Sequence, residues 1–398
     1  MKISRINIFI IILPLVLSLI DILNISNTNF HNHFSKFHNT DFDEQIYWYL
    51  VQIMLSLIIL MAYSIFSNVK PNTDKFENPK FNKNEERLHN IILMCFFLIA
   101  MYKVFVIIQY GFIEYLLKSR MGLIPQGFIG HMLLIYLPML LAMEFKINTN
   151  RLYFCLIFFV FTFLCISTGY RIHFIIGLLM IFIMNLHYFR NLKFYKVFTF
   201  FSIILISIYF FETLREEYFG GSYADRNLLD SLNRTNPISF ISYIDSRNLN
   251  IDFGMFLQTF ITPFSTILSH FGFTEDHMGH SIMDIYQKLF HSYLSWRGTP
   301  EYMATGFSMG FFATAFMFGG ILGLCFFSIV YGIILAFAKY FYLSRGYVSQ
   351  LFGGSLMVFL IYCNETPVEG VKSLVYWIFL FFIFSILLRL MSLLGKVR

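Results

Sequence analysis

Four side chains that could donate or accept a proton lie close together between residues 276 and 284. They are Asp276, His277, His280 and Asp284, and a helix would bring them onto neighbouring turns of one side. Activation of a hydroxyl for group transfer requires a carboxylate or an imidazole within hydrogen-bond reach, and each of the four meets that requirement. The pattern predicts an acid–base site, and it does not choose among the four residues.

The same residues are also a candidate metal site, because their spacing would place them on one helical face. No H-E-x-x-H motif and no paired cysteines accompany them. We therefore expect neither a metal nor another cofactor.

Arginines form the second group of side chains with chemical potential. The hydrophilic segment 212–301 carries Arg215, Arg226, Arg234, Arg247 and Arg297 but only one lysine, Lys288. A guanidinium binds phosphate oxygens with two parallel hydrogen bonds and stays charged at any working pH. One interpretation is a phosphate-recognising surface that includes Arg215, Arg226 and Arg297. The other is a solvated surface on which the acids of the segment pair with the arginines.

Arg171 stands apart from that segment, in the sequence Ser167-Thr168-Gly169-Tyr170-Arg171 between two apolar runs. Almost no loop separates the two runs, so Arg171 is expected at the membrane surface. It either reaches toward lipid headgroups beside Tyr170 in an aromatic belt, or serves with Tyr170 as a fixed binding element for a lipid phosphate.

The chain as a whole is too apolar to fold in water. Of its 398 residues, 57% are hydrophobic and 13% are charged, against about 25% charged in soluble proteins. Apolar runs recur at close to the roughly 20 residues that cross a bilayer. The five cysteines lie in these runs, so no disulfide framework is expected. We predict an all-α polytopic membrane protein.

The apolar runs predict ten spans, near residues 6–23, 46–66, 90–110, 126–144, 152–168, 172–189, 195–211, 310–338, 348–364 and 373–391. They define an N-terminal bundle of seven helices at 1–211, one large extracytoplasmic loop at 212–301, long enough for a helical cap, and a C-terminal bundle of three helices at 302–398. The stretch 302–340 exceeds one perpendicular span, and its glycines at 306, 310, 319, 320 and 323 permit a re-entrant turn. The count is eleven if this stretch enters the membrane twice.

Charge sets the orientation. With the N-terminus inside, the cytoplasmic ends and loops hold most of the lysines and arginines outside the large loop. The short outer loops hold only Lys36, Lys118, Arg120, Arg171 and Lys372. This distribution predicts that both termini are cytoplasmic. It also accounts for the net charge of +6, so no nucleic-acid partner is implied. The first span lacks a small-residue cleavage site and is interpreted as an uncleaved signal anchor.

A few ionisable residues fall within or beside the spans. Lys103 lies inside a span near its outer end, where we favour snorkelling to the surface over a substrate role. Asp21, Glu144, Glu365 and Glu369 stand near span ends. The centres of the spans are otherwise almost without charge.

These features together resemble the oligosaccharide repeat-unit polymerases of the O-antigen polymerase (Wzy) type. Many spans surround one large outer loop, the sequence 167–171 is similar to the family's small-small-x-Arg motif, and the sequence 304–323 is similar to its glycine-punctuated segment after the loop. Family members commonly carry an acidic residue where this chain has Thr314, so no catalytic role is expected there.

The resemblance implies a GT-C-like fold in the bacterial inner membrane. It implies transfer of a glycan from one undecaprenyl-diphosphate carrier to another lipid-linked repeat unit at the outer face, without a nucleotide sugar. The expected partners are the lipid-linked oligosaccharide, membrane lipid, a chain-length regulator and a flippase. External arginines would stabilise the departing diphosphate.

Other classes of protein stay open. A flippase or secondary transporter predicts short loops and charges along a mid-membrane path. A lipid-linked glycan ligase shares the polymerase architecture and differs in its acceptor. A membrane acyltransferase would need a histidine-centred site at the cytoplasmic side, where only His89 and His187 lie, and a purely structural membrane protein is the remaining alternative.

Overall fold

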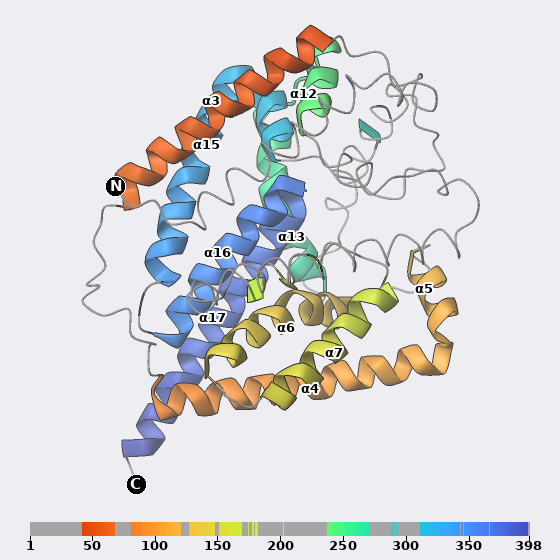
Figure 1. Cartoon of the computed structure of the whole chain (residues 1–398), viewed down its shortest axis with the longest axis vertical. Coiled ribbons are helices and arrows are strands. Elements are labelled where there is room, and N and C mark those ends of the chain that lie inside the picture. Colours follow the sequence, from red (N-terminus) through yellow and green to blue (C-terminus); the bar gives the residue numbers. More distant parts are fainter. Residues whose placement is uncertain are drawn as a thin grey trace. The chain divides into compact units, whose positions relative to one another are not determined.

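The computed structural model describes nearly three fifths of the chain, as separate stretches. They are residues 42–67, 81–120, 127–147, 151–168, 237–270, 311–342, 344, 346–365 and 367–396, with the single residues 174, 177, 178, 180, 181, 202, 288, 289 and 292. The secondary structure within these stretches is helical, and they contain no β-strand (Figure 1). The prediction of an all-α protein is confirmed for this part of the chain.

Within the described stretches, seven helices coincide with predicted spans. They are α3 (Phe42–Ser67), α4 (Lys83–Tyr110), α6 (Gly127–Ile147), α7 (Arg151–Thr168), α15 (Phe311–Tyr342), α16 (Tyr347–Glu365) and α17 (Pro367–Lys396). Three further helices occupy segments predicted as loops, namely α5 (Phe112–Arg120), α12 (Pro237–Ser246) and α13 (Phe253–His270). The predicted spans at 6–23, 172–189 and 195–211 fall almost entirely outside the described residues.

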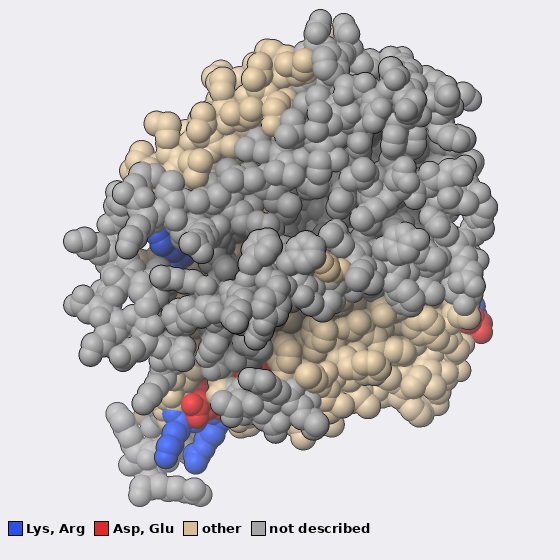
Figure 2. Space-filling view, in the orientation of Figure 1, with Lys and Arg blue, Asp and Glu red and all other residues tan. Residues whose placement is uncertain are grey.

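Several helices have the length and surface of membrane spans. Among the described residues, four segments are long and apolar enough to cross a bilayer: Ile46–Ser67, Lys83–Tyr110, Phe312–Tyr342 and Leu374–Met391. On α3 the exposed residues Leu50, Met54, Leu57 and Met61 recur every three to four positions and form an outward apolar stripe. Figure 2 shows that charged side chains reach the described surface of one face only in small groups. A lipid environment explains this surface, and the chain is a helical membrane protein.

The chain forms two compact units, each assembled from segments that are distant in sequence. One unit comprises Met1–Lys70, Leu229–Tyr340 and Phe359–Val375, and the other comprises Pro71–Leu228, Phe341–Val358 and Tyr376–Arg398. We call them the first and the second unit. The parts expected from sequence, 1–211, 212–301 and 302–398, concern membrane topology and stay a prediction.

The core of the first unit joins α3 and α15 to helices of the predicted loop. Trp48 of α3 packs edge-on against Phe316 of α15, with ring centroids 5.0 Å apart. Ile241 and Ile244 of α12 are buried in the same apolar cluster. At Gly332 the two long helices approach closely, because a Cβ there would lie 2.6 Å from the carbonyl oxygen of Ile59. The predicted loop therefore shares a core with two membrane helices.

Helix α15 is broken and folds back on itself. Its backbone leaves the helical conformation at Gly319 and Gly320, and Gly320 has a φ of 56°. The rings of Phe312 and Tyr331 lie 6.1 Å apart, whereas a straight helix would separate these positions by about 28 Å. We call the two legs, 311–318 and 321–342, the glycine hairpin. The break falls at two of the glycines where the sequence permits a re-entrant turn.

The segment before α13 is joined to this break. The backbone N–H of Ile251 donates to the carbonyl of Met317 at 3.1 Å. A break in a helix leaves carbonyls without their usual partner four residues later, and Ile251 satisfies one of them. Phe256 of α13 stacks on Phe318 with centroids 4.4 Å apart and contacts Phe327 at 5.1 Å.

The second unit is built around α4, α6 and α7, which lie side by side (Figure 1). Helix α5 follows α4 after Gly111 and packs on α4 and α7. Tyr136 of α6 meets Trp377 of α17 edge-on at 4.5 Å. The apolar face of α4 that does not contact these helices is exposed, with Leu98, Phe105 and Ile108 among its residues. This arrangement suits a bundle whose outer faces contact lipid.

Candidate functional site

The residues that the sequence predicts for the site lie outside the described stretches. These are the acid–base candidates Asp276, His277, His280 and Asp284 and the binding candidates Tyr170, Arg171, Arg215, Arg226 and Arg297. Described neighbours reach close to them along the chain, since α7 ends at Thr168 and α13 ends at His270. The predicted roles of all nine residues stay predictions.

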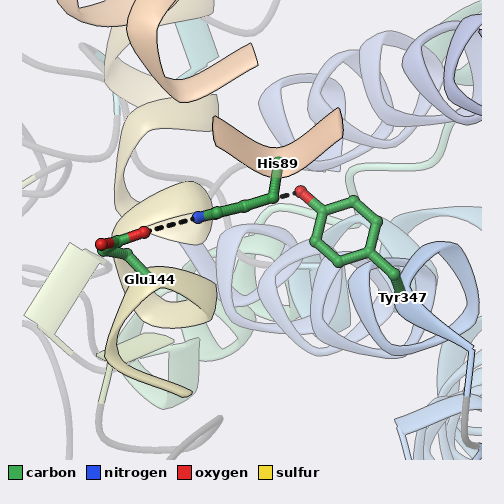
Figure 3. Close-up of polar contacts among 3 residues, drawn as sticks. All are labelled: His89, Glu144 and Tyr347. Atoms are coloured by element: carbon green, nitrogen blue, oxygen red, sulfur yellow. Dashed lines mark hydrogen bonds and ion pairs between the residues drawn. The ribbon is translucent and has the colours of Figure 1, made fainter. Parts of the chain in front are cut away.

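A buried polar cluster of three side chains lies in the second unit (Figure 3). The imidazole of His89 on α4 lies between Glu144 of α6 and Tyr347 at the start of α16. Its Nε2 atom is 2.9 Å from Glu144 Oε2, and its Nδ1 atom is 2.9 Å from the hydroxyl of Tyr347. The exposed fractions are 0% for His89, 1% for Glu144 and 0% for Tyr347. We call this set the polar junction.

The carboxylate of Glu85 forms hydrogen bonds at the beginnings of α4 and α16, two of the helices that carry the polar junction. Glu85 accepts the backbone N–H of Asn82 at 2.9 Å and the backbone N–H of Tyr347 at 3.0 Å. The Asn82 side chain accepts the N–H of Asn84 at 2.9 Å, which completes a capping box at the start of α4. The sequence forms this cap because Asn precedes Glu by three residues at a helix start. Glu85 therefore links α4 to α16 through the backbone and supports His89 one turn further along.

The polar junction has the order carboxylate, imidazole, hydroxyl. With neutral His89, the Nε2–H group donates to Glu144 and Nδ1 accepts the proton of the Tyr347 hydroxyl. In that state the carboxylate fixes the tautomer and orientation of the ring, as a third group does in hydrolytic triads. With charged His89, both ring nitrogens donate. The chain of three groups can thus hold a proton on His89 or pass it along the two hydrogen bonds.

Burial limits what this cluster can do. All three side chains are covered, and Glu144 Oε1 has no hydrogen-bond partner among the described residues. A substrate cannot reach the imidazole in this conformation, so the junction does not provide the accessible histidine that an acyltransferase requires. A buried carboxylate with a single partner does bind that partner tightly, because an unpaired buried charge costs several kcal/mol. The arrangement holds the ends of α4, α6 and α16 together.

The intramembrane Lys103 has an aromatic neighbour in the same unit. Its ammonium group lies 5.4 Å from the ring centroid of Tyr115 on α5. A cation–π contact lowers the cost of placing the charge near lipid. On the same short helix Glu114 and Lys118 form an exposed ion pair at 2.6 Å, and the hydrogen bond to Glu114 raises the pKa of Lys118. The interfacial role expected for Lys103 stays a prediction.

Metal ligands are not gathered in the parts of the chain that the structure describes. Those stretches contain no group of three His, Cys, Asp or Glu side chains that could hold an ion. Thr314, at the position where the resembling family commonly has an acid, is buried in the first leg of the glycine hairpin.

Sequence reasoning did not find the polar junction. His89 and Glu144 are 55 residues apart, and His89 and Tyr347 are 258 residues apart. The available signal was weak: His89 precedes one predicted span, Glu144 ends another, and Tyr347 precedes a third. All three ends are expected on the same side of the membrane. That coincidence could have indicated that the three residues meet.

No family model matches this sequence, and no curated protein or solved structure matches it either.

Proposed function

We propose that the chain is a polysaccharide polymerase of the bacterial inner membrane. It would transfer a glycan from one undecaprenyl-diphosphate carrier to another lipid-linked repeat unit at the outer face. The observation that carries this proposal is the glycine hairpin, which is joined to the predicted loop through Ile251 and Phe256. The hairpin includes the end of the segment 304–323, on which part of the family resemblance rests.

The hairpin supports the proposal because a polymerase must hold sugar and lipid at once. The glycan is polar and needs the hydrophilic loop, while the isoprenoid chain needs a lipid-facing helix. Through the shared core of the first unit, α12 and α13 of the loop are packed on α3 and α15. A rigid connection of this kind would keep the bound diphosphate at a constant distance from the sugar-binding residues.

The proposed topology is the one expected from charge. Ten spans, or eleven if the glycine hairpin counts as a separate entry, would place both termini in the cytoplasm and the segment 212–301 outside. Arg171 and Tyr170 would then lie at the outer membrane surface, and Arg215, Arg226 and Arg297 would face it from the loop. The polar junction would lie at the cytoplasmic ends of α4, α6 and α16, away from the reaction.

The reaction follows from these roles. A hydroxyl at the non-reducing end of the acceptor attacks the anomeric carbon of the donor glycan, and a new carbon–oxygen bond forms. The bond between that carbon and the diphosphate oxygen breaks, and undecaprenyl diphosphate leaves with the electron pair. One of Asp276, His277, His280 and Asp284 accepts the proton of the hydroxyl. The arginines stabilise the charge that develops on the diphosphate.

Substitution of the arginines tests this proposal. Arg171, Arg215 and Arg297 are replaced singly by Ala and by Lys in a strain that lacks the chromosomal copy, and polymer ladders are compared at matched protein levels. We expect the Ala variants to give short or absent ladders and the Lys variants to give intermediate ones, because lysine keeps the charge but not the bidentate geometry.

Arg247→Ala is the matched control. Arg247 belongs to the same predicted loop, is exposed just after α12, and has no role in the proposal. Full-length ladders from all three Ala variants, or equal losses in the Arg247 variant, would contradict the assignment of the phosphate site.

The buried pair of His89 and Glu144 favours one competing function, that of a flippase or proton-coupled transporter. Ionisable residues buried among membrane helices are frequent elements of proton relays. The two functions differ in the state of the deletion strain. Loss of a polymerase leaves single repeat units on the outer face, whereas loss of a flippase leaves them on the cytoplasmic face. A glycan ligase would instead leave finished polymer on its carrier lipid.

A further inference from the structure

Helix α13 exposes an apolar stripe although it lies in the segment predicted as a hydrophilic loop. Five large side chains on it are exposed by 39% to 61%: Phe253, Leu257, Ile261, Phe264 and Leu268. Steps of three and four residues place them on one side of a helix. No charged residue occurs in the sequence from Phe253 to Ser269. A helix with such a surface needs an apolar environment on that side.

The buried side of α13 is attached to a candidate membrane span. Phe256 is buried, stacks on Phe318 and meets Phe327 of α15 at a tilt. The ring centroids of Phe253 and Phe318 lie 5.9 Å apart. Beside this attachment α15 exposes its own apolar residues, including Leu322 and Phe326. The stripe on α13 therefore continues an apolar surface that belongs to a membrane-spanning helix.

The position of Phe327 along α15 sets the depth of this attachment. Lys339 is the only charged residue of α15, and its ammonium group lies over the Tyr63 ring near the end of α3, at 5.2 Å. We take this level as one edge of the hydrocarbon layer, because charged groups stay near the interface. At about 1.5 Å per residue, Phe327 lies about 18 Å from that level. The hydrocarbon layer is about 30 Å thick, so Phe327 lies within it.

From these observations we infer that α13 is embedded in the bilayer. It lies in the leaflet farther from Lys339, with Phe256 toward α15 and the stripe toward lipid acyl chains. The segment 212–301 is thus interrupted by a lipid-contacting helix and is not one continuous aqueous loop. This inference concerns the environment of α13 and does not depend on glycan transfer.

The hydrogen bond from Ile251 to Met317 is consistent with this placement. A backbone N–H entering the apolar layer must find a partner, since water is absent there. Ile251 stands just before α13 and uses the carbonyl that the break in α15 leaves free. The polar side chains of α13 before His270 are uncharged amides and hydroxyls, and Asp252, directly before the helix, accepts the backbone N–H of Met255 at 2.6 Å as a cap. The backbone N–H groups of Ile251 and Met255, where the chain enters the layer, thus have hydrogen-bond partners.

Spin labels on single cysteines test the inference. The five native cysteines are replaced by Ala, and single cysteines are introduced at Leu257, Ile261 and Phe264 in the full chain. The labelled proteins are reconstituted in vesicles of phosphatidylethanolamine and phosphatidylglycerol, and collision rates with oxygen and with a nickel chelate are measured. Oxygen concentrates in the acyl region, whereas the chelate stays in water.

Two further positions calibrate the measurement. Leu322→Cys on α15, exposed by 82%, reports the lipid environment, and Arg247→Cys after α12 reports the aqueous one. We expect the α13 positions to match Leu322, with oxygen collisions exceeding chelate collisions. Chelate collisions as frequent as at Arg247 would overturn the inference. Low collision rates with both reagents would also overturn it, because a second copy or another part of the chain would then cover the stripe.

A second readout avoids the cysteine replacements. In Phe264→Trp an aromatic ring is kept, so the packing of α13 changes little. We expect lipids brominated on the acyl chain to quench the added fluorescence relative to the unsubstituted chain. If brominated lipid does not quench the fluorescence that the new tryptophan adds, position 264 is not in contact with acyl chains, and the inference is contradicted.

Discussion

His89 and Glu144 form the most deeply buried ionisable pair among the described residues, with His89 Nε2 and Glu144 Oε2 2.9 Å apart. The pair joins α4 to α6, and Tyr347 extends it to α16. Because the three helix ends meet on these groups, the pair is expected to determine the stability of the second unit more than any surface contact of that unit.

Removal of the imidazole should destabilise the protein strongly. In His89→Ala the carboxylate of Glu144 stays buried without its partner, and breaking a buried pair in this way costs about 3–5 kcal/mol. We expect a large fall in the thermal unfolding temperature of the protein in detergent. Glu114→Gln, which breaks the exposed pair with Lys118, is the control and should change stability little. A His89→Ala protein as stable as the control would show that the pair is not structural.

Tyr347→Phe tests what the hydroxyl of Tyr347 contributes to stability, because it removes only that group. The ring still packs edge-on against Phe81, at 6.0 Å, but His89 Nδ1 loses its hydrogen bond, and an unsatisfied buried group costs about 1–3 kcal/mol. The unfolding temperature should fall less than in His89→Ala. Tyr102→Phe, on the exposed face of α4, serves as the control. Equal unfolding temperatures for the two Tyr→Phe variants would mean that the hydroxyl contributes nothing.

Glu85 and Glu86 allow a comparison of two neighbouring carboxylates. Both lie in the first turn of α4 and benefit equally from the helix dipole. Only Glu85 accepts the N–H groups of Asn82 and Tyr347. Glu85→Ala should therefore cost about 1–2 kcal/mol more than Glu86→Ala, the magnitude of a lost cap. Hydrogen exchange at the starts of α4 and α16 gives a local readout, and similar exchange in both variants would contradict the bridging role.

The glycine hairpin can be tested at its turn. Gly320 has a φ of 56°, which side chains with a Cβ adopt at a cost of about 1–3 kcal/mol. Gly319 has a φ of −146°, and an added Cβ would meet no atom within 4 Å. Gly320→Ala should lower the unfolding temperature, and Gly319→Ala should leave it nearly unchanged. Equal unfolding temperatures for the two variants would show that the turn does not require a residue with positive φ at position 320.

The ion pair between Glu114 and Lys118 predicts a pH dependence at high pH only. The folded pKa of Lys118 is raised above 10.5, so any stabilisation is complete below that value and is lost as the pH rises through the folded pKa. Between pH 6 and pH 9 the wild type and Glu114→Gln should therefore show a constant difference in unfolding temperature. A difference that changes within this interval would point to another titrating group.

Local properties of the sequence were sufficient to predict seven of the described helices, those that coincide with apolar runs. The spans at 46–66 and 348–364 follow from the length of apolar runs, and the structure has α3 and α16 there. The glycines of 302–340 indicated where a helix could break. The stripe on α13 was also present in the sequence, as apolar residues at helical spacing, but the polar residues around it favoured a loop. Such features depend on neighbours within a few residues along the chain.

The contacts that define the two units could not be read in the same way. Nothing near His89 in the sequence specifies Glu144 or Tyr347 as partners, and nothing near Phe256 specifies Phe318 or Phe327. An apolar run tells which residues avoid water, but lipid and a neighbouring helix are both apolar, so hydrophobicity alone does not decide which face packs and which face meets the bilayer. The sequence by itself determined that this is a helical membrane protein with a charge asymmetry. Only the tertiary structure decided which helix ends share a buried proton-binding group and how the loop helices attach to α15, because those choices depend on side-chain packing and on the pairing of buried polar atoms.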